Sequence, residues 1–156
     1  MRQTRAVESW TQAPLEGFVQ ESSARLTLLM TPAGQVLAQY GFTRAVDVMA
    51  AAALGAAIFS STTEIAKMLK EREFAALNHQ GVRHGIFLGS FNTRRGRLLA
   101  LVVYGPDSSL GLVQLFFEDL VAKLVAASPE KIEQKPVLAA DFERELTQSL
   151  ASLFGR

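Results

Sequence analysis

The sequence predicts an α/β protein of the α+β type, in which a five-stranded, mostly antiparallel sheet is sandwiched by helices. Three stretches carry this prediction: an alanine-rich helical stretch that begins near Asp47, an apolar strand over residues 97–104, and an amphipathic helix over residues 110–127. Shorter stretches with the composition of strands lie between them, which gives the element order αββαβββα. With helices on both faces of one sheet, each of these apolar faces is buried.

The N-terminal part of the chain predicts one helix and a hairpin. Pro14 can start the first helix, because proline is tolerated at the first helical position, and the helix runs to about Ser22. Residues 25–31 and 35–41 have strand composition and are joined by a proline–glycine turn, so we expect them to form a hairpin. Asp47 then suits the N-cap of the long central helix, and Thr43 is an earlier alternative.

The central helix has two unlike stripes. One consists of large apolar side chains at steps of four and seven, which we expect to seal the sheet: Leu54, Ile58, Ile65 and Leu69. The other consists of small or polar side chains at steps of three and four: Ala52, Ala56, Ser60, Thr63 and Lys67. A nearly flat surface of this kind lets a second backbone approach closely. Alanine is also the best helix former, so helix propensity alone is the competing interpretation.

Three strands and a helix are expected after the central helix. Residues 74–79 form a short strand, and residues 83–91 form a longer one whose two glycines suggest a bulge or a close backbone contact. Residues 97–104 are almost continuously apolar, which is typical of a strand buried on both faces in the middle of a sheet. Ser108 or Ser109 can then cap the last main helix.

The chain divides into a domain over residues 1–127, a linker over residues 128–140 and a C-terminal amphipathic helix over residues 141–156. The linker is charged and contains two prolines. The C-terminal helix is marginal alone and must pack somewhere, either on its own domain or on a partner. Its docking edge consists of four apolar residues: Phe142, Leu146, Leu150 and Leu153.

Composition excludes several classes of protein. The 156 residues include no cysteine, which removes disulfides, thiolate metal sites and cysteine nucleophiles and fits a reducing, cytoplasmic setting. The net charge of +1 offers no broad field to nucleic acid. The apolar run over residues 50–59 is too short for a bilayer, and the N-terminus lacks the apolar region of a signal peptide. We therefore expect neither nucleic acid nor a membrane as a partner.

An enzyme is the main competing class of function. The Walker A, GxGxxG, HExxH and GxSxG patterns do not occur in the sequence, so we expect no catalytic residues, cofactor or metal. His79 and His84 are the two histidines, and with no carboxylate near them in sequence they are more often strand residues than ligands. Arg94 and Arg95 lie in a turn, where we expect solvated charge rather than an arginine finger.

Several runs of the sequence together resemble the roadblock family of dynein light-chain-like proteins. They are LTLLMTPAGQVLAQYG, AVDVMAAAALGAAIFSSTTEIAKML, REFAALNHQG and, after LLALVVYGPD, SSLGLVQLFFEDL. Within the family, the chain most resembles the bacterial MglB type, through EF followed by HQG and through DSSLGLVQL. The resemblance covers about residues 14–127 and depends on the order of elements rather than on one motif.

This resemblance implies a homodimer in which the central helices pair antiparallel and the strand after them pairs across the two-fold axis. The implied dimer residues on that strand are Phe74, Ala76, Leu77, Asn78 and His79. The resemblance also implies GTPase activation of a small Ras-like GTPase of the MglA type, with two protomers per GTPase, in bacterial cell polarity and gliding motility. A cell pole is then one expected location. No arginine finger is donated, because the GTPase is remodelled until its own residues complete the site.

The resemblance also assigns contact residues for the GTPase. By position, these candidates are Ala52, Ala56, Ser60, Thr63, Glu64 and Lys67. Glu64 is charged where close relatives tend to have a small residue, so we expect a salt bridge there. The C-terminal helix resembles one that reaches the GTPase and influences nucleotide exchange. A roadblock scaffold dimer that binds a GTPase or receptor complex without stimulating hydrolysis needs the same face and stays an alternative.

Overall fold

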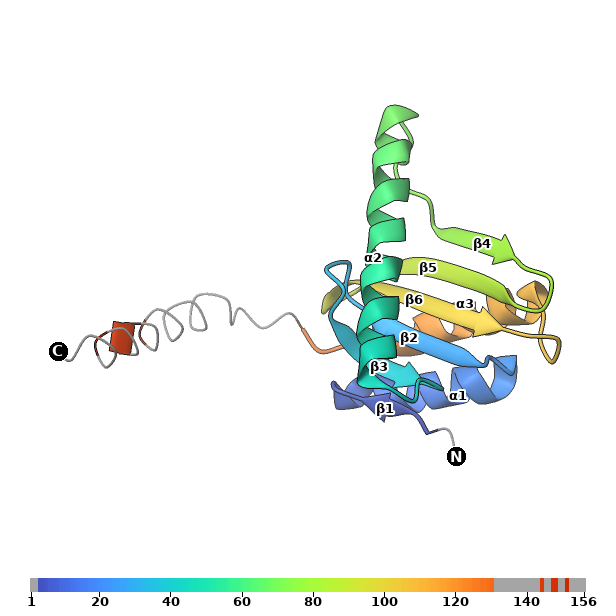
Figure 1. The fold of residues 1–156 in the computed structure, drawn as a ribbon, viewed down its shortest axis with the longest axis horizontal. Coiled ribbons are helices and arrows are strands. Elements are labelled where there is room, and N and C mark those ends of the chain that lie inside the picture. Colours follow the sequence, from blue (N-terminus) through green and yellow to red (C-terminus); the bar gives the residue numbers. More distant parts are fainter. Residues whose placement is uncertain (1–2, 131–143, 145–146, 149–150, 152–156) are drawn as a thin grey trace.

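One antiparallel sheet of six strands runs through the molecule in the order β1-β3-β2-β6-β5-β4 (Figure 1). The computed structural model describes residues 3–130 together with residues 144, 147, 148 and 151. The predicted α+β sandwich is confirmed, but the sheet has six strands rather than five, because two N-terminal residues pair with Gln39 and Ala38. The strands are β1 (Arg5–Ala6), β2 (Leu26–Met30), β3 (Val36–Tyr40), β4 (Ala76–Gln80), β5 (Gly85–Thr93) and β6 (Gly96–Tyr104).

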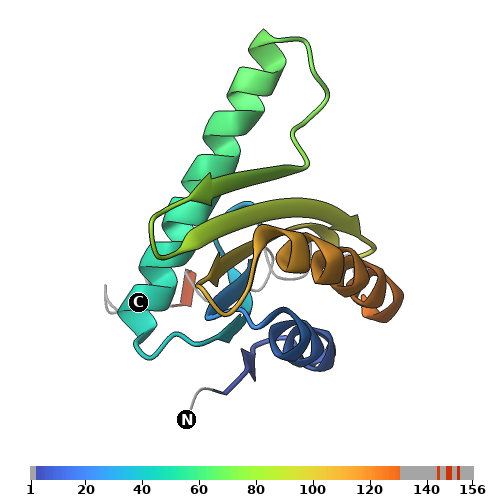
Figure 2. The same ribbon diagram turned by 90° about the vertical axis from the view of Figure 1, so that its right-hand side faces the viewer.

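Helices cover both faces of the sheet. The helices α1 (Gln12–Ser22) and α3 (Leu110–Ala127) lie side by side on one face, and α2 (Ala45–Met68) crosses the other face (Figures 1 and 2). A short 3-10 turn, η1 (Ser9–Thr11), precedes α1. The strand β6 lies in the middle of the sheet, between β2 and β5, and buries residues on both faces, as its continuous apolar run predicted.

The larger core lies between the sheet and the α1–α3 pair. Leu15 of α1 and Leu124 of α3 are fully buried there with Leu98 of β6. Phe117 of α3 meets the ring of Phe87 edge-on, with the ring centroids 5.0 Å apart. A Cβ on Gly89 would lie 2.4 Å from Cζ of Phe117. The close backbone contact that the sequence predicted from the glycines of β5 is therefore present.

The α2 face of the sheet is packed by the small side of the helix, so the predicted orientation of α2 is wrong. Ala52, Gly55 and Ala66 are its buried residues. The large apolar stripe points outward: Leu54 is 65% exposed, and Ile58, Ile65 and Leu69 are exposed as well. The physical reason is the close approach of helix and sheet. A Cβ on Gly55 would lie 2.7 Å from Cε of Met30, so the sheet's own large side chains fill this layer.

The helix ends differ from the prediction by a few residues. The helix α1 begins at Gln12, two residues before Pro14, and the proline is tolerated because first-turn N–H groups lack helical partners anyway. The helix α2 begins at Ala45, so Asp47 lies in the first turn rather than at the N-cap. Ser109 caps α3 as predicted, since its hydroxyl oxygen accepts a hydrogen bond from the backbone N–H of Leu112 at 3.2 Å.

Ser128, one residue beyond the predicted domain of residues 1–127, packs against that domain. Ser128 is 2% exposed, donates to the carbonyl of Val125 and accepts from the backbone N–H of Arg94. Residues 144, 147, 148 and 151 are helical. The four residues of the predicted docking edge, Phe142, Leu146, Leu150 and Leu153, lie outside the described residues.

Candidate protein-interaction site

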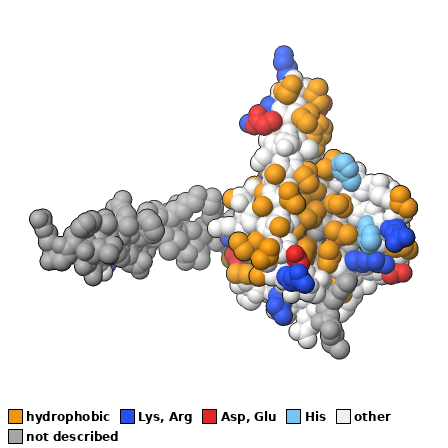
Figure 3. Space-filling model, in the orientation of Figure 1, with side chains coloured by type: hydrophobic (Ala, Val, Ile, Leu, Met, Phe, Trp, Pro, Cys, Tyr) orange, Lys and Arg blue, Asp and Glu red, His pale blue; other side chains and the backbone are white. Residues whose placement is uncertain are grey.

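An apolar stripe runs along the outer side of α2. We call it the outer stripe. It consists of these exposed large side chains: Val46, Met49, Leu54, Ile58, Ile65, Met68 and Leu69. Apolar side chains gather over α2 and the neighbouring part of the sheet in Figure 3. Exposed apolar patches of this extent on a soluble domain mark interaction surfaces. Both sides of α2 are thus apolar, the inner side small and the outer side large.

The composition of α2 also meets the simplest test for a membrane span. Among the described residues it is the one helix that is long and apolar enough, a criterion of length and composition only. Its most apolar window has a mean hydropathy of 1.5 and is 11% buried. One side of the helix is nevertheless occupied by its own sheet, through Ala52 and Gly55. A bilayer would therefore meet only the outer stripe.

The distal part of α2 projects beyond the edge of the sheet (Figures 1 and 2). Met68 in its last turn is 81% exposed. Ser61, Thr62 and Thr63, near the point of departure, donate their hydroxyls back to carbonyls of the preceding turn, at Ala57 and Phe59. These hydroxyl groups are thereby satisfied within the helix, and the projecting part exposes Ile65, Met68 and Leu69.

The edge strand β4 lies beneath the projecting helix and, among the strands of the described residues, pairs only with β5. The strand covers Ala76–Gln80, so Phe74 of the predicted dimer strand precedes it, in the connector from α2. Ala76, Asn78 and His79 are exposed, and Leu77 is half-buried. Asn78 already accepts a hydrogen bond from the hydroxyl of Tyr104 at 2.9 Å.

A small apolar cavity of about 310 Å³ opens between α2 and β4. It is called the α2–β4 pocket below, and its main lining residues are Phe59, Ile65, Phe74, Leu77 and Leu88. Phe74 remains 42% exposed although it is aromatic. The projecting helix, the open strand edge and this pocket are contiguous, and together they are called the α2–β4 surface.

The predicted GTPase-contact residues differ in how exposed they are in the structure. Ala52 is 1% exposed and packs on its own sheet, so it offers no surface to a partner. Ala56 and Thr63 are half-buried. Ser60, Glu64 and Lys67 are exposed on the projecting part of α2, where Oε1 of Glu64 and Nζ of Lys67 lie 3.0 Å apart. The contact role of the accessible residues stays a prediction.

The sequence interpretation missed the outer stripe. Leu54 and Ile65 were assigned to the interior because large apolar residues usually are buried. The available signal was the run Ala51–Gly55, whose small residues allow a sheet to approach, together with the fact that residues 48–59 contain no polar side chain. A helix that is apolar all round must be covered on both sides.

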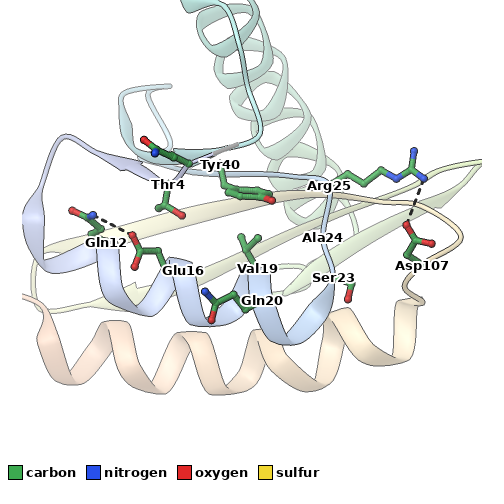
Figure 4. A pocket seen from close by; sticks show the side chains of 11 residues that line it. Thr4, Gln12, Glu16, Val19, Gln20, Ser23, Ala24, Arg25, Tyr40 and Asp107 are labelled. Carbon is green, nitrogen blue, oxygen red and sulfur yellow. Dashed lines mark hydrogen bonds and ion pairs between the residues drawn. The ribbon is translucent and has the colours of Figure 1, made fainter. Parts of the chain in front are cut away.

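A second, polar groove of about 870 Å³ lies on the other side of the molecule, between α1, β3 and the N-terminal segment (Figure 4). Its charged and amide groups are largely paired with one another. Arg25 reaches toward Asp107, 3.8 Å away, and Gln12 donates to Glu16 at 3.1 Å. The groove is open and has no cluster of metal-binding side chains in the part of the chain described.

Both arginines and His84, which the sequence singled out, have partners within the chain. Arg94 donates to the carbonyl of Ala126 at 3.2 Å, and Arg95 binds Glu8. His84 Nε2 lies 3.1 Å from Nη1 of Arg25. Because a guanidinium has only donors, Nε2 of His84 is the acceptor in this contact.

The fold is similar to that of solved bacterial structures. MglB of Myxococcus xanthus matches with a TM-score of 0.67 at 23% identity, covering 74% of this chain and 92% of that one. The gliding protein MglB of Thermus thermophilus matches with a TM-score of 0.67 at 26% identity, covering 76% and 88%. A Roadblock/LC7 domain from Streptomyces avermitilis matches with a TM-score of 0.61 at 15% identity, covering 70% and 89%. No protein-family model and no curated protein sequence matches the chain.

Proposed function

Because the chain has a roadblock fold of the MglB type, we propose that it is a homodimeric regulator of a small Ras-like GTPase of the MglA type. Its role is GTPase activation in bacterial cell polarity and gliding motility. It acts in the cytoplasm, with a cell pole as one place of action. The observation that carries the proposal is the α2–β4 surface, where an apolar helix side and an open strand edge are exposed together.

The open edge of β4 supports the homodimer. An exposed strand edge is normally protected by proline, lysine or a covering element, and β4 contains neither proline nor lysine. Antiparallel pairing of two β4 strands would satisfy both edges and would join two sheets into one. The two-fold axis would then lie beside β4, as an isologous interface requires.

The projecting helix supports the same assembly. With an axis beside β4, the projecting part of each α2 lies above the partner's β4 rather than in water. Met68 and Leu69 are then brought to the α2–β4 pocket of the second copy, whose lining is apolar. The burial of such side chains contributes roughly 1.5–3 kcal/mol each before ordering costs.

The GTPase is proposed to bind on the outer side of the paired α2 helices, with two protomers for each GTPase. Ser60, Glu64 and Lys67 are the accessible polar candidates for this contact. No side chain of this chain enters the catalytic site of the GTPase in the proposal. Stimulation comes instead from remodelling of the GTPase, whose own residues then position water and stabilise the charge of the transition state.

Sedimentation tests the dimer on which this function depends. The wild-type chain is expected to sediment as a dimer at micromolar concentration. Met68→Asp buries a charge in the proposed interface and is expected to weaken the dimer about tenfold or more. Val7→Asp, at an exposed position near β1, is the matched control and leaves the dimer intact. A monomeric wild-type chain refutes the proposal.

A further inference from the structure

Arg97 is the second residue of the central strand β6 and lies on the α2 face of the sheet. It is paired in register with Asn92 of β5. Side chains alternate along a strand, so Arg97 shares its face with Leu99 and Leu101, which pack beneath α2. A charged side chain thus stands at the border of an apolar layer, and it is 24% exposed.

The guanidinium of Arg97 contacts α2 through Phe59. Its Cζ lies 5.8 Å from the centroid of the Phe59 ring, within the range of a cation–π interaction. Phe59 is a partly buried member of the apolar cluster under α2. Beyond it, Ile65, Met68 and Leu69 are exposed. Phe59 is therefore the last residue of α2 in that cluster.

The same guanidinium forms an ion pair with Glu73 in the connector between α2 and β4. Glu73 lies between two backbone anchors of this connector. The N–H of Glu71 bonds to the carbonyl of Ala66 at the end of α2, and the carbonyl of Ala75 accepts from the N–H of Ser90 on β5. Arg97 thus joins three elements: β6, α2 and the connector that leads into β4.

We infer that Arg97 is the positioning residue of the α2–β4 surface. Through Phe59 it fixes the direction in which α2 projects, and through Glu73 it fixes where β4 begins. Phe74, which lines the α2–β4 pocket, directly follows Glu73. The inference rests on the proposed function, because the two elements that Arg97 holds are the two parts of the proposed dimer interface.

The chemistry of arginine suits this position better than that of lysine. A planar guanidinium can lie against an aromatic ring with its face and donate to a carboxylate with its edge. A lysine ammonium is a compact charge that cannot do both with one orientation. The Arg97→Lys variant is therefore expected to hold α2 and β4 in place less well than Arg97 does.

The test compares two arginines at the same end of the sheet. Arg97→Met keeps an apolar stem and removes the charge. Arg95→Met likewise removes the charge of an arginine while keeping an apolar stem. Arg95 forms an ion pair of comparable exposure with Glu8, beside the opposite edge strand β1. Both variants are measured as full-length chains by amide hydrogen exchange of β4 and by the dissociation constant of the dimer.

Arg97→Met is expected to accelerate exchange of the β4 amides that bond to β5 and to weaken the dimer about tenfold, whereas Arg95→Met changes neither. Adding Glu73→Gln to Arg97→Met is expected to have little further effect, because the two residues act as one unit. Equal β4 exchange and equal dissociation constants in the two variants overturn the inference. A monomeric wild-type chain with faster β4 exchange in Arg97→Met alone refutes the dimer but supports the positioning role.

Discussion

The Nε of Arg95 lies 2.9 Å from both carboxylate oxygens of Glu8. This contact joins the β5–β6 turn to the segment before α1, across 87 positions of sequence. The neighbouring Arg94 is held at the end of α3, through Ser128 and Ala126. The arginine pair therefore has a structural role in this domain.

We expect neither arginine to act as a catalytic finger. Arg95→Ala should lower the free energy of unfolding by about 1–2 kcal/mol, because it leaves the partly buried Glu8 without its charged donor. GTPase stimulation at saturating protein should persist, whereas loss of a finger costs about three to five orders of magnitude. Urea unfolding and single-turnover hydrolysis measure the two effects. If Arg95→Ala abolished GTPase stimulation while the complex still formed, Arg95 would be acting as a catalytic finger.

The inward orientation of the small stripe predicts unequal costs for one substitution at adjacent positions. Ala52→Leu should destabilise the fold by about 1–3 kcal/mol, because the site is filled by the sheet's side chains. Ala53→Leu, on the exposed side of α2, should stay within about 0.5 kcal/mol of the wild type. Urea unfolding at a fixed protein concentration compares them. Equal costs at the two positions would contradict this orientation of α2.

Lys70 ends α2 in a conformation that favours glycine. Its φ is 57°, and the bonds from the Lys70 N–H to Lys67 and from the Glu71 N–H to Ala66 form a Schellman motif. A left-handed residue other than glycine costs about 1–2 kcal/mol, and the extra chain entropy of glycine offsets part of this. Lys70→Gly should therefore raise the free energy of unfolding by about 0.5–1 kcal/mol.

The same substitution at Lys67, inside the last turn of α2, provides the comparison for Lys70. Lys67→Gly should lower the free energy of unfolding by about 1 kcal/mol, because glycine is a poor helix former there. Thermal or urea unfolding of both variants gives the comparison. A loss of stability in Lys70→Gly similar to that in Lys67→Gly would be inconsistent with the capping geometry.

The C-terminal segment is best removed after Ser128, because Ser128 belongs to the packed domain. The chain cut there should keep its stability, its dimer and most of the hydrolysis stimulation. A chain cut after Ala127 loses the bonds of Ser128 and should be less stable by about 1–2 kcal/mol. Thermal unfolding of the two truncated chains compares their stability.

We expect the removed segment to contribute affinity for the GTPase and to alter nucleotide release. Its apolar edge of Phe142, Leu146, Leu150 and Leu153 remains the predicted docking edge, and tethering raises the effective concentration of such a helix at its site. Release of a fluorescent nucleotide and the affinity of the complex are the measurements. If the rate of nucleotide release and the affinity of the complex are unchanged after truncation at Ser128, the segment does not have this role.

Much of the fold was predictable because local signals agreed with the global arrangement. The apolar run of β6 predicted a central strand, and Ser109 predicted a helix start. The orientation of α2 was not predictable from periodicity, since periodicity defines the sides of a helix but not which neighbour meets which side. Met30 and Leu99 fill the layer beneath it from strands distant in sequence.

The candidate site was predicted as a region but not residue by residue. The edge strand after the central helix was expected, and β4 is that strand, although it begins at Ala76 rather than Phe74. The strand β1 was missed because a pair of residues shows no alternation. Ala52 is buried on its own sheet, and the sequence did not indicate this because a small residue suits a partner interface and a close contact within the chain equally well.

The most direct test of the central claim is GTP hydrolysis by an MglA-type GTPase in the presence of the dimer. The wild-type chain should raise the single-turnover rate, with saturation at two protomers per GTPase. Ser60→Arg should abolish the increase by placing bulk on the outer side of α2, whereas Gln114→Arg, exposed on α3 across the sheet, should preserve it. A complex that forms without any increase in hydrolysis would contradict activation and would favour the scaffold alternative.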